Sequence, residues 1–345
     1  MKKSIITLAF AALLVIASAS VAVAKPGFNK AYREAKSLFA DGAYSDAIMW
    51  FELSGKCSDA PSNNDVQSWI AKCNQKINAA SFVLAEEDRH ETINGYNVVW
   101  STNTTPAQKS TITALLNQMV SIDGGVFTMG ATAEQGNEAL SNEKVSHKVF
   151  VNNFAMGKFE VTQDLWSAVM GANPSCFKGD KQPVENVSWS DTQNFITKIN
   201  ILTGLQFALP TEAQWEYAAR GGKYNDNNTN KFSGSNYINT VAWYYDSRDS
   251  QTHEVGSKEA NQLGLYDMSG NVSEWCNDWF CGEYYNCTVQ ENPLDNPQGP
   301  SYGTTRSIRG GSWSDYSREC RVSCRRSGDP DFRYCSYGFR LVISL

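Results

Sequence analysis

A short stretch near residue 270 carries oxygen-bearing groups at a spacing that could bind calcium. Asp267 and Glu274 supply carboxylates, and Gly270 and Val272 between them can turn backbone carbonyls toward the same ion. Calcium takes six to eight oxygen ligands at about 2.3–2.6 Å and tolerates irregular loops, and glycine permits the tight turn. These four residues are therefore predicted calcium ligands. In the alternative interpretation, the two carboxylates only cap turns.

Nine cysteines form the second chemically capable set, and nine is odd, so at least one thiol has no partner within the chain. Near the C-terminus, two of Cys320, Cys324 and Cys335 are expected to form a disulfide, or Cys320 is a small buried residue. A two-thiolate site built from Cys320 and Cys324 is the alternative. Disulfides are also favoured over a zinc site for a second group, Cys276, Cys281 and Cys287.

The segment 314–337 is rich in Tyr, Ser, Arg, Gly and Asp. Tyr and Arg make contacts at low entropic cost, whereas Ser and Gly adapt, as in antibody loops. We expect an exposed ligand-binding surface, and its candidate residues are Trp313, Tyr316, Phe332, Tyr334 and Tyr337. In contrast, Arg321, Arg325 and Arg340 are expected to pair with carboxylates inside the protein.

The sequence predicts only a few regular elements that could position these groups. Two or three helices in a loop-rich chain with short strands indicate an α+β fold. Capping boxes at Ser190–Gln193 and Thr211–Gln214 precede two helices, and a third short helix is expected from Thr162 to Gly171. Alternation around Gly124-Gly125 predicts a hairpin over residues 120–130. From residue 223 onward, the chain is dominated by turn-forming and aromatic residues.

The N-terminal third has a different pattern. Residues 28–77 show helical periods on either side of Gly42 and resemble a tetratricopeptide helix pair followed by a third helix. We assign 25–80 to a small helical unit, which either docks a protein or is only a packing spacer. Residues 81–118 are expected to be a linker with one helix, and 119–345 the main domain.

The first residues predict export. Lys2 and Lys3 precede an apolar run that ends in Ala22-Val23-Ala24, which is typical of a signal peptide cleaved near Ala24. A retained membrane anchor is the alternative, and no transmembrane span is expected after cleavage. The net charge of −6 argues against nucleic acid as a partner. A secreted or periplasmic location follows.

Sequence blocks in the second part share an order with a known family. They are Val120-x-x-x-Gly124-Gly125-x-Phe127-x-Met129-Gly130, Phe159-Glu-Val-Thr-Gln163, Pro183-Val-x-Asn186-Val-Ser-Trp189, Leu209–Arg220, Gly264–Trp275, and Arg309-Gly-Gly-Ser-Trp313 to Gly338-Phe-Arg340. Together they resemble the formylglycine-generating-enzyme (sulfatase-modifying-factor) domain over about residues 119–345. The resemblance implies that family's variant of the C-type-lectin fold, with little regular secondary structure and bound calcium. One family calcium site matches Asp267, Gly270, Val272 and Glu274.

The resemblance also implies a copper(I) site of two cysteines that uses dioxygen to oxidise a sulfatase cysteine to formylglycine. The first cysteine is expected three residues after Ser312, where this chain has Asp315, and the second at Cys320. A carboxylate is a poor copper(I) ligand. Ser273 and Ala208 also replace a family tryptophan and arginine. We therefore expect a non-catalytic, calcium-binding member with a protein or glycan partner in the cell envelope. The alternatives are a copper-dependent oxidase acting through Cys320 and Ser312, or a pure scaffold.

Overall fold

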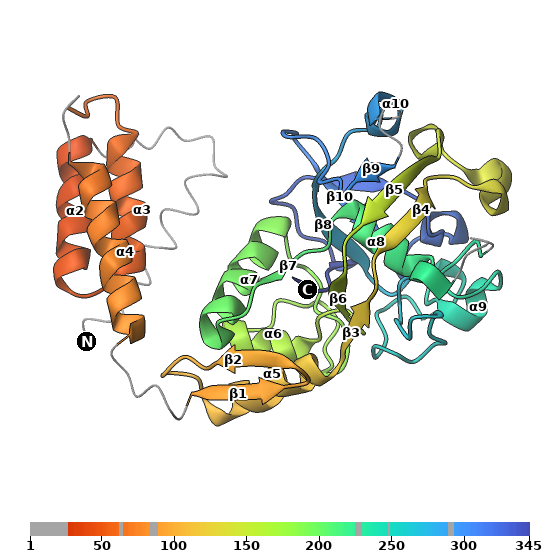
Figure 1. Ribbon diagram of the computed structural model, residues 1–345, viewed down its shortest axis with the longest axis horizontal. Helices are drawn as coiled ribbons and strands as arrows, with labels where there is room; N and C mark the ends of the chain where they lie inside the picture. Colours follow the sequence, from red (N-terminus) through yellow and green to blue (C-terminus); the bar gives the residue numbers. More distant parts are fainter. Residues whose placement is uncertain (1–26, 62–64, 83–88, 225–229, 248, 289–292) are drawn as a thin grey trace. The chain divides into compact units, whose positions relative to one another are not determined.

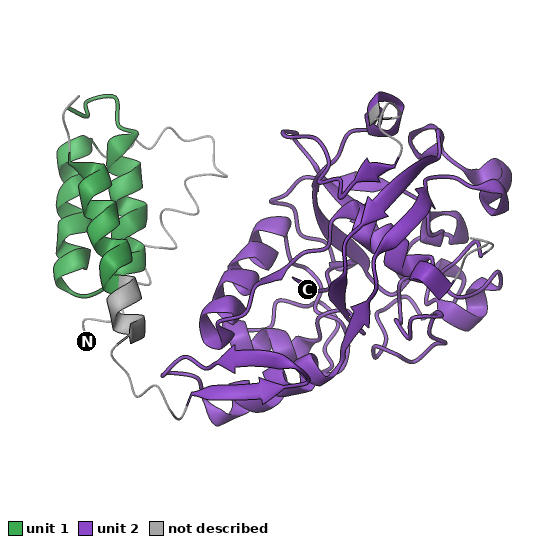
Figure 2. Ribbon diagram, viewed as in Figure 1, with its two compact units in different colours: residues 1–86 green, residues 87–345 purple. Residues whose placement is uncertain are grey.

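A computed structural model describes residues 27–345 except for 62–64, 83–88, 225–229, 248 and 289–292, and it omits the side chains of 77–82. The predicted signal peptide therefore lies outside the described residues. The chain forms two compact units, residues 1–86 and residues 87–345 (Figure 2). Among the described residues, no helix combines the length and apolarity needed to cross a membrane.

The first unit consists of three helices, as the periodicity predicts (Figure 1). They are α2 (Phe28–Ala40), α3 (Tyr44–Gly55) and α4 (Val66–Phe82). Phe51 is fully buried and stacks on Trp69, with ring centroids 5.7 Å apart. Gly42 has a φ of 79° and follows the end of α2, where the sequence predicts a break between two helices. The tetratricopeptide relationship itself stays a prediction.

The second unit has the predicted α+β composition, with short strands in four small sheets. Two four-stranded sheets have the orders β3-β6-β13-β7 and β11-β10-β8-β12, and the smaller sheets are β4-β5-β9 and β1-β2. The strand bounds are β1 (His90–Ile93), β2 (Tyr96–Val99), β3 (Met119–Ile122), β4 (Gly125–Met129), β5 (His147–Val151), β6 (Phe154–Gly157), β7 (Phe207–Ala208), β8 (Ser273–Trp279), β9 (Leu294–Asp295), β10 (Arg306–Arg309), β11 (Arg326–Gly328), β12 (Tyr337–Gly338) and β13 (Val342–Ser344).

The expected hairpin over residues 120–130 is not formed. Strand β3 pairs with β6, whereas β4 pairs with β5, so the two halves belong to different sheets. A Cβ on Gly124 would lie 2.1 Å from the carbonyl oxygen of Val151. The Gly-Gly pair therefore allows the backbone to pass close to another strand instead of folding β3 back on β4.

The helices of this unit are α5 (Pro106–Asn117), α6 (Gln163–Met170), α7 (Trp189–Thr203), α8 (Glu212–Ala219) and the short α9 (Ile238–Val241) and α10 (Tyr284–Thr288). Helix α6 and the Thr211 capping box of α8 match the sequence predictions. The Ser190 capping box is wrong, because α7 begins at Trp189, two residues earlier than that box implies, and Ser188 caps it together with Asp191. Gly204 ends α7 in the left-handed conformation, as expected.

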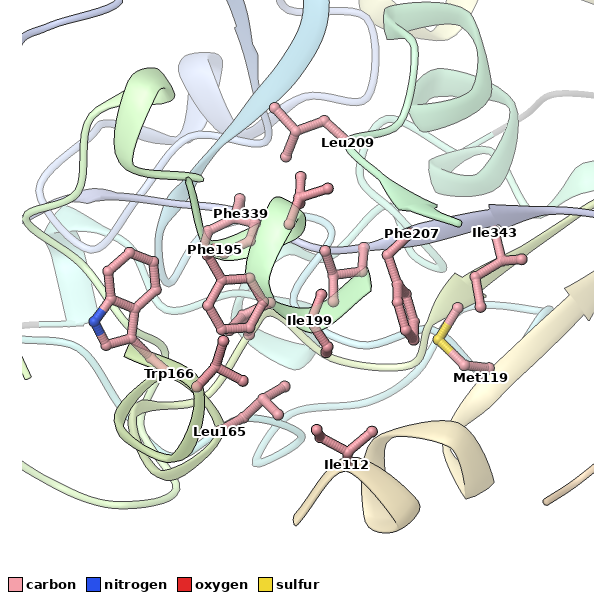
Figure 3. Close-up of a cluster of buried hydrophobic side chains, with 14 of the residues drawn as sticks. Ile112, Met119, Leu165, Trp166, Phe195, Ile199, Phe207, Leu209, Phe339 and Ile343 are labelled. Atoms are coloured by element: carbon pink, nitrogen blue, oxygen red, sulfur yellow. The ribbon is translucent and has the colours of Figure 1, made fainter. Parts of the chain in front are cut away.

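The segment expected to be a linker with one helix contains such a helix, α5, and also the unexpected strands β1 and β2. Val98, Trp100, Ile112 and Leu116 are almost completely buried in the main hydrophobic cluster of the second unit. Figure 3 shows Ile112 beside Leu165, and Met119 beside Phe207 and Ile343. Trp166 and Phe195 stack in the same cluster, with ring centroids 5.3 Å apart. The compact unit therefore begins well before residue 119.

Candidate functional site

Asp315, which stands at the first position of the expected cysteine pair, is held in a polar cluster. One carboxylate oxygen accepts from Arg326 at 2.5 Å, and the other accepts from the Ser312 hydroxyl at 2.6 Å. Ser273, at the tryptophan position of the expected motif, lies 3.4 Å from the same carboxylate. Asp315 is therefore paired in a structural ion pair and is not free to bind another cation without losing Arg326.

Cys320 lies behind this cluster in apolar surroundings. It is fully buried and packs with Phe232, Val241, Ala242 and Tyr244. Burial raises the pKa of the Cys320 thiol well above its usual value, and the negative charge of Asp315 adds to the effect. The thiol form is thus stabilised, whereas copper(I) binding needs the thiolate. One buried thiol and one ion-paired carboxylate do not fit a copper(I) centre.

The expected disulfide among the three C-terminal cysteines is wrong. Cys335 is bonded to Cys176, 159 residues away in the sequence. Cys320 and Cys324 are both free and buried, which agrees with the alternative prediction that Cys320 is a small core residue. Cys276, Cys281 and Cys287 are free as well, so the structure does not form disulfides in that group.

The residues predicted to bind calcium divide into two sets. Asp267 is buried, and its Oδ1 has no hydrogen-bond partner among the described residues. Glu274 is instead paired with Arg340 through both oxygens at 2.6 and 2.7 Å and also accepts from Trp215. Asp267 and the left-handed turn at Gly270 (φ 84°) fit a cation site, whereas Arg340 already pairs with the carboxylate of Glu274.

A further buried carboxylate near Asp267 was not predicted. Glu160 accepts from the Asn271 side chain at 2.7 Å and from the Val272 backbone at 3.0 Å. Burial raises its pKa well above the usual value, and the charges of Asp267 and Glu274 contribute. Glu160 is part of the Phe159-Glu-Val-Thr-Gln163 block, which the sequence analysis did single out. Its carboxylate could have been grouped with the predicted calcium ligands at residues 267–274.

Most of the predicted ligand-binding aromatics are exposed. Tyr316, Phe332 and Tyr334 are 55%, 57% and 49% exposed, while Tyr337 is half-buried against Tyr334 with ring centroids 4.8 Å apart. Trp313 is also half-buried, and its indole nitrogen donates to the Cys335 carbonyl at 3.0 Å. The ring of Tyr245 contacts that of Tyr316 at a tilt of 54°, with centroids 4.8 Å apart, an exposed contact that sequence reasoning missed.

The structure also contains a pocket of about 240 Å³ that no motif predicted. Charged residues from separate segments contribute to its lining, including Lys158, Glu160, Asp164, Lys181 and Glu254. An ion pair between Lys181 and Asp164 at 2.6 Å occupies part of this lining. Because its residues come from separate segments, no local spacing in the sequence reveals it.

Comparison with known families gives a match along most of the chain. The family described as Sulfatase-modifying factor enzyme 1-like domain matches residues 104–345. The chain belongs to this family. The match starts within the stretch expected to be a linker, in agreement with the position of α5 in the compact unit.

Two curated relatives illustrate the range of the sulfatase-modifying factor family. The chaperone protein LppX of Paenibacillus barcinonensis is 30% identical over 282 residues, which cover 67% of this chain and 91% of LppX. The formylglycine-generating enzyme of Streptomyces coelicolor is 35% identical over 192 residues, or 51% of this chain and 57% of the enzyme. The chain therefore spans little more than half of that enzyme.

Solved structures of the family support the fold. Treponema denticola variable protein 1 superposes with a TM-score of 0.58 at 29% identity, covering 76% of this chain and 100% of that protein. PvdO from Pseudomonas aeruginosa gives a TM-score of 0.57 at 27% identity, covering 66% and 94%. The predicted formylglycine-generating-enzyme variant of the C-type-lectin fold is thus confirmed for the main domain.

Proposed function

We propose that this chain is a non-catalytic member of the sulfatase-modifying factor family that binds a protein or glycan partner in the cell envelope. The observation that carries the proposal is the ion pair between Asp315 and Arg326 at 2.5 Å. It stands where the resemblance expects a catalytic cysteine. The remaining thiol of Cys320 is buried, and its thiol form is favoured. The oxidase alternative lacks a comparable observation in its favour.

The envelope assignment rests on two features. The first is the sequence of the N-terminus, which is typical of a cleaved signal peptide. The second is the Cys176–Cys335 disulfide, since such bonds persist mainly in oxidising compartments. Both features favour a secreted or periplasmic protein.

The partner-binding role rests on the exposed aromatics near Asp315. Tyr and Phe supply large contact areas with few rotatable bonds, and exposed aromatics are common in binding surfaces. Tyr316, Phe332 and Tyr334 provide this area without contributing to the buried core. A chaperone name, as LppX carries, is consistent with a protein as the partner.

Calcium is part of the proposal as a structural ion. Asp267 would hold it, with the carbonyls of Gly270 and Val272 as further donors, and Glu160 is a second buried carboxylate nearby. A bound cation supplies positive charge that offsets the repulsion between these buried acids. The carboxylate of Glu274 is the weakest member of the set, because Arg340 already neutralises it.

A binding experiment tests the proposed surface. Purified protein is screened on a glycan array and on immobilised envelope proteins, and the screen is repeated with a triple variant, Tyr316→Ser, Phe332→Ser and Tyr334→Ser. Tyr302→Ser is a matched control, since Tyr302 is 84% exposed and lies outside the surface. We expect the triple variant to bind its partner at least tenfold more weakly, and the control to bind normally. Equal binding by wild type and triple variant would contradict the proposal.

A further inference from the structure

The Cys176–Cys335 disulfide lies beside a buried carboxyl group. Cys176 is exposed and Cys335 is half-buried, whereas Glu185 is completely buried. A carboxylate oxygen of Glu185 lies within 4.8 Å of both sulfur atoms. Among the described residues, these three are the one group of His, Cys, Asp and Glu side chains this close together, and their sulfur atoms are already bonded to each other.

Glu185 has an incomplete set of polar partners. The backbone N–H of Phe177 donates to its Oε1 at 2.8 Å, and the backbone N–H of Cys176 also acts on the carboxylate, while Oε2 has no direct hydrogen-bond partner among the described residues. Lys178 is the charged group that acts on it, but the Lys178 ammonium group donates to the Asn173 carbonyl at 3.0 Å. A buried acid without an ion-pair partner is costly to keep ionised. Burial accordingly raises the pKa of Glu185 to about 7, so the group can hold or release a proton near neutral pH.

We propose that Cys176–Cys335 is a redox-active disulfide that an external dithiol reduces, with Glu185 as the proton donor and acceptor for Cys335. The exposed side of the bond is Cys176, so an incoming thiolate attacks the Sγ of Cys176. The S–S bond breaks, and its electron pair goes to the Sγ of Cys335. Glu185 gives its proton to that leaving sulfur, and solvent later reprotonates Glu185.

The second half of the reaction completes a two-electron exchange. The remaining thiol of the dithiol, as a thiolate, attacks the dithiol's own sulfur in the mixed disulfide. A new disulfide forms within the dithiol, and Cys176 leaves as a thiolate that takes a proton from solvent. The protein gains two electrons and two protons, and the dithiol loses the same. In the reverse direction, the Glu185 carboxylate accepts the proton of the Cys335 thiol.

The bond connects directly to the exposed aromatic region. Trp313 donates to the Cys335 carbonyl, and its ring contacts Phe177 with centroids 5.3 Å apart. The Asn186 backbone N–H donates to the Tyr334 carbonyl at 2.9 Å, one residue before Cys335. Cleavage of the disulfide therefore changes the surroundings of Trp313, whose fluorescence provides a readout.

The test measures how fast dithiothreitol reduces this bond in the folded full-length protein between pH 5 and 9. Alkylation and mass spectrometry quantify Cys176 and Cys335, and the rate is divided by the concentration of dithiothreitol thiolate. Wild type, Glu185→Gln and the matched control Glu319→Gln are compared, since Glu319 is a half-buried carboxylate that does not belong to the group around the disulfide. Melting temperatures confirm that each variant is folded.

We expect the wild-type rate per thiolate to be constant below about pH 7 and then to fall about tenfold per pH unit. Glu185→Gln should be at least tenfold slower at pH 6 and should lack the break, whereas Glu319→Gln should behave like wild type. A wild-type profile without a break near pH 7 would overturn the role of Glu185 even if Glu185→Gln failed to fold. Reduction only after unfolding would overturn the redox role of the bond.

Discussion

At the level of single residues, position 315 differs from what the family resemblance implies, because it holds an aspartate and not a cysteine. A carboxylate at position 315 attracts Arg326 and the hydroxyl of Ser312, and thereby builds an ion pair in place of a metal ligand. Cys320 is present at the second expected cysteine position, but its side chain packs among apolar side chains. A thiol in such surroundings behaves as a small hydrophobic residue.

Buried arginine–carboxylate pairs provide the other residue-scale feature. Arg321, Arg325 and Arg340 pair with Glu143, Glu212 and Glu274, which confirms the expectation of internal pairing. Arg309 also joins Glu212 and Glu216. These pairs connect segments that are far apart in the sequence, since Glu212 lies in α8, Glu274 in β8 and Arg309 in β10.

Glu212 makes stability depend on acidity. Burial alone would raise its pKa, but Arg325 and Arg309 outweigh burial and lower the pKa to about 2. A carboxylate whose pKa is depressed in the folded state stabilises the protein above its usual pKa of 4.5, and this contribution is lost as the pH falls toward 2. We expect the wild-type free energy of unfolding to fall over this range.

The matched variant is Glu212→Gln, which leaves Arg325 and Arg309 without their shared counter-ion. Its free energy of unfolding at pH 7 should be about 3–5 kcal/mol lower, and its loss between pH 4.5 and 2 should be smaller. Urea unfolding at several pH values measures both quantities. An equal pH slope in wild type and variant would show that Glu212 does not carry the effect.

At the level of elements, local signals in the sequence predict some boundaries and miss others. Gly204 and Gly171 end their helices as expected, because a left-handed residue at a helix end favours glycine. Strand partners were not predictable, since β3 and β4 pair with β6 and β5 through long-range contacts. Ser188 lies two residues before Ser190 and can also cap a helix. The local sequence therefore does not determine which of the two serines is the N-cap of α7.

The same limit applies to the candidate site. The positions of Asp315 and Cys320 follow from motif spacing, but the Arg326 partner and the Cys176–Cys335 bond depend on how distant loops meet. One helix was expected between residues 81 and 118, and α5 is such a helix, but the weak periodicity gave no sign of β1 and β2, which are only four residues long each.

Helix α8 offers a direct test of a predicted cap. The Thr211 hydroxyl accepts from the Gln214 backbone N–H at 3.1 Å, while the Thr211 backbone N–H donates to the Gln214 side chain. Thr211→Ala should lower the free energy of unfolding by about 1 kcal/mol, and Thr211→Ser should nearly preserve it. Chemical denaturation measures the difference. An alanine variant as stable as wild type would show that this cap is dispensable.

At the level of the whole molecule, the second unit combines buried hydrophobic clusters with a buried acidic group around Glu160 and Asp267. Repulsion among buried carboxylates lowers stability unless protons, arginine or a cation offset it. Arg340 provides part of that charge through Glu274. A calcium ion bound at Asp267 would provide the rest.

Calcium removal therefore has a defined expected result. EDTA should lower the melting temperature of protein shown to carry calcium, and added calcium should restore it. Asp267→Ala should remove this response, whereas the exposed control Asp180→Ala should retain it. No change on calcium removal, with loss of the ion confirmed by metal analysis, would contradict a stabilising role.

Turnover of a sulfatase peptide tests the central claim most directly. Wild-type protein supplied with copper(I) is incubated in air with a peptide containing Cys-x-Pro-x-Arg, beside an active formylglycine-generating enzyme and the Cys320→Ser variant, and peptide mass is followed. The ion pair of Asp315 with Arg326 predicts no aldehyde product from wild type while the active enzyme converts the peptide. Aldehyde formation that is abolished by Cys320→Ser would contradict the non-catalytic assignment.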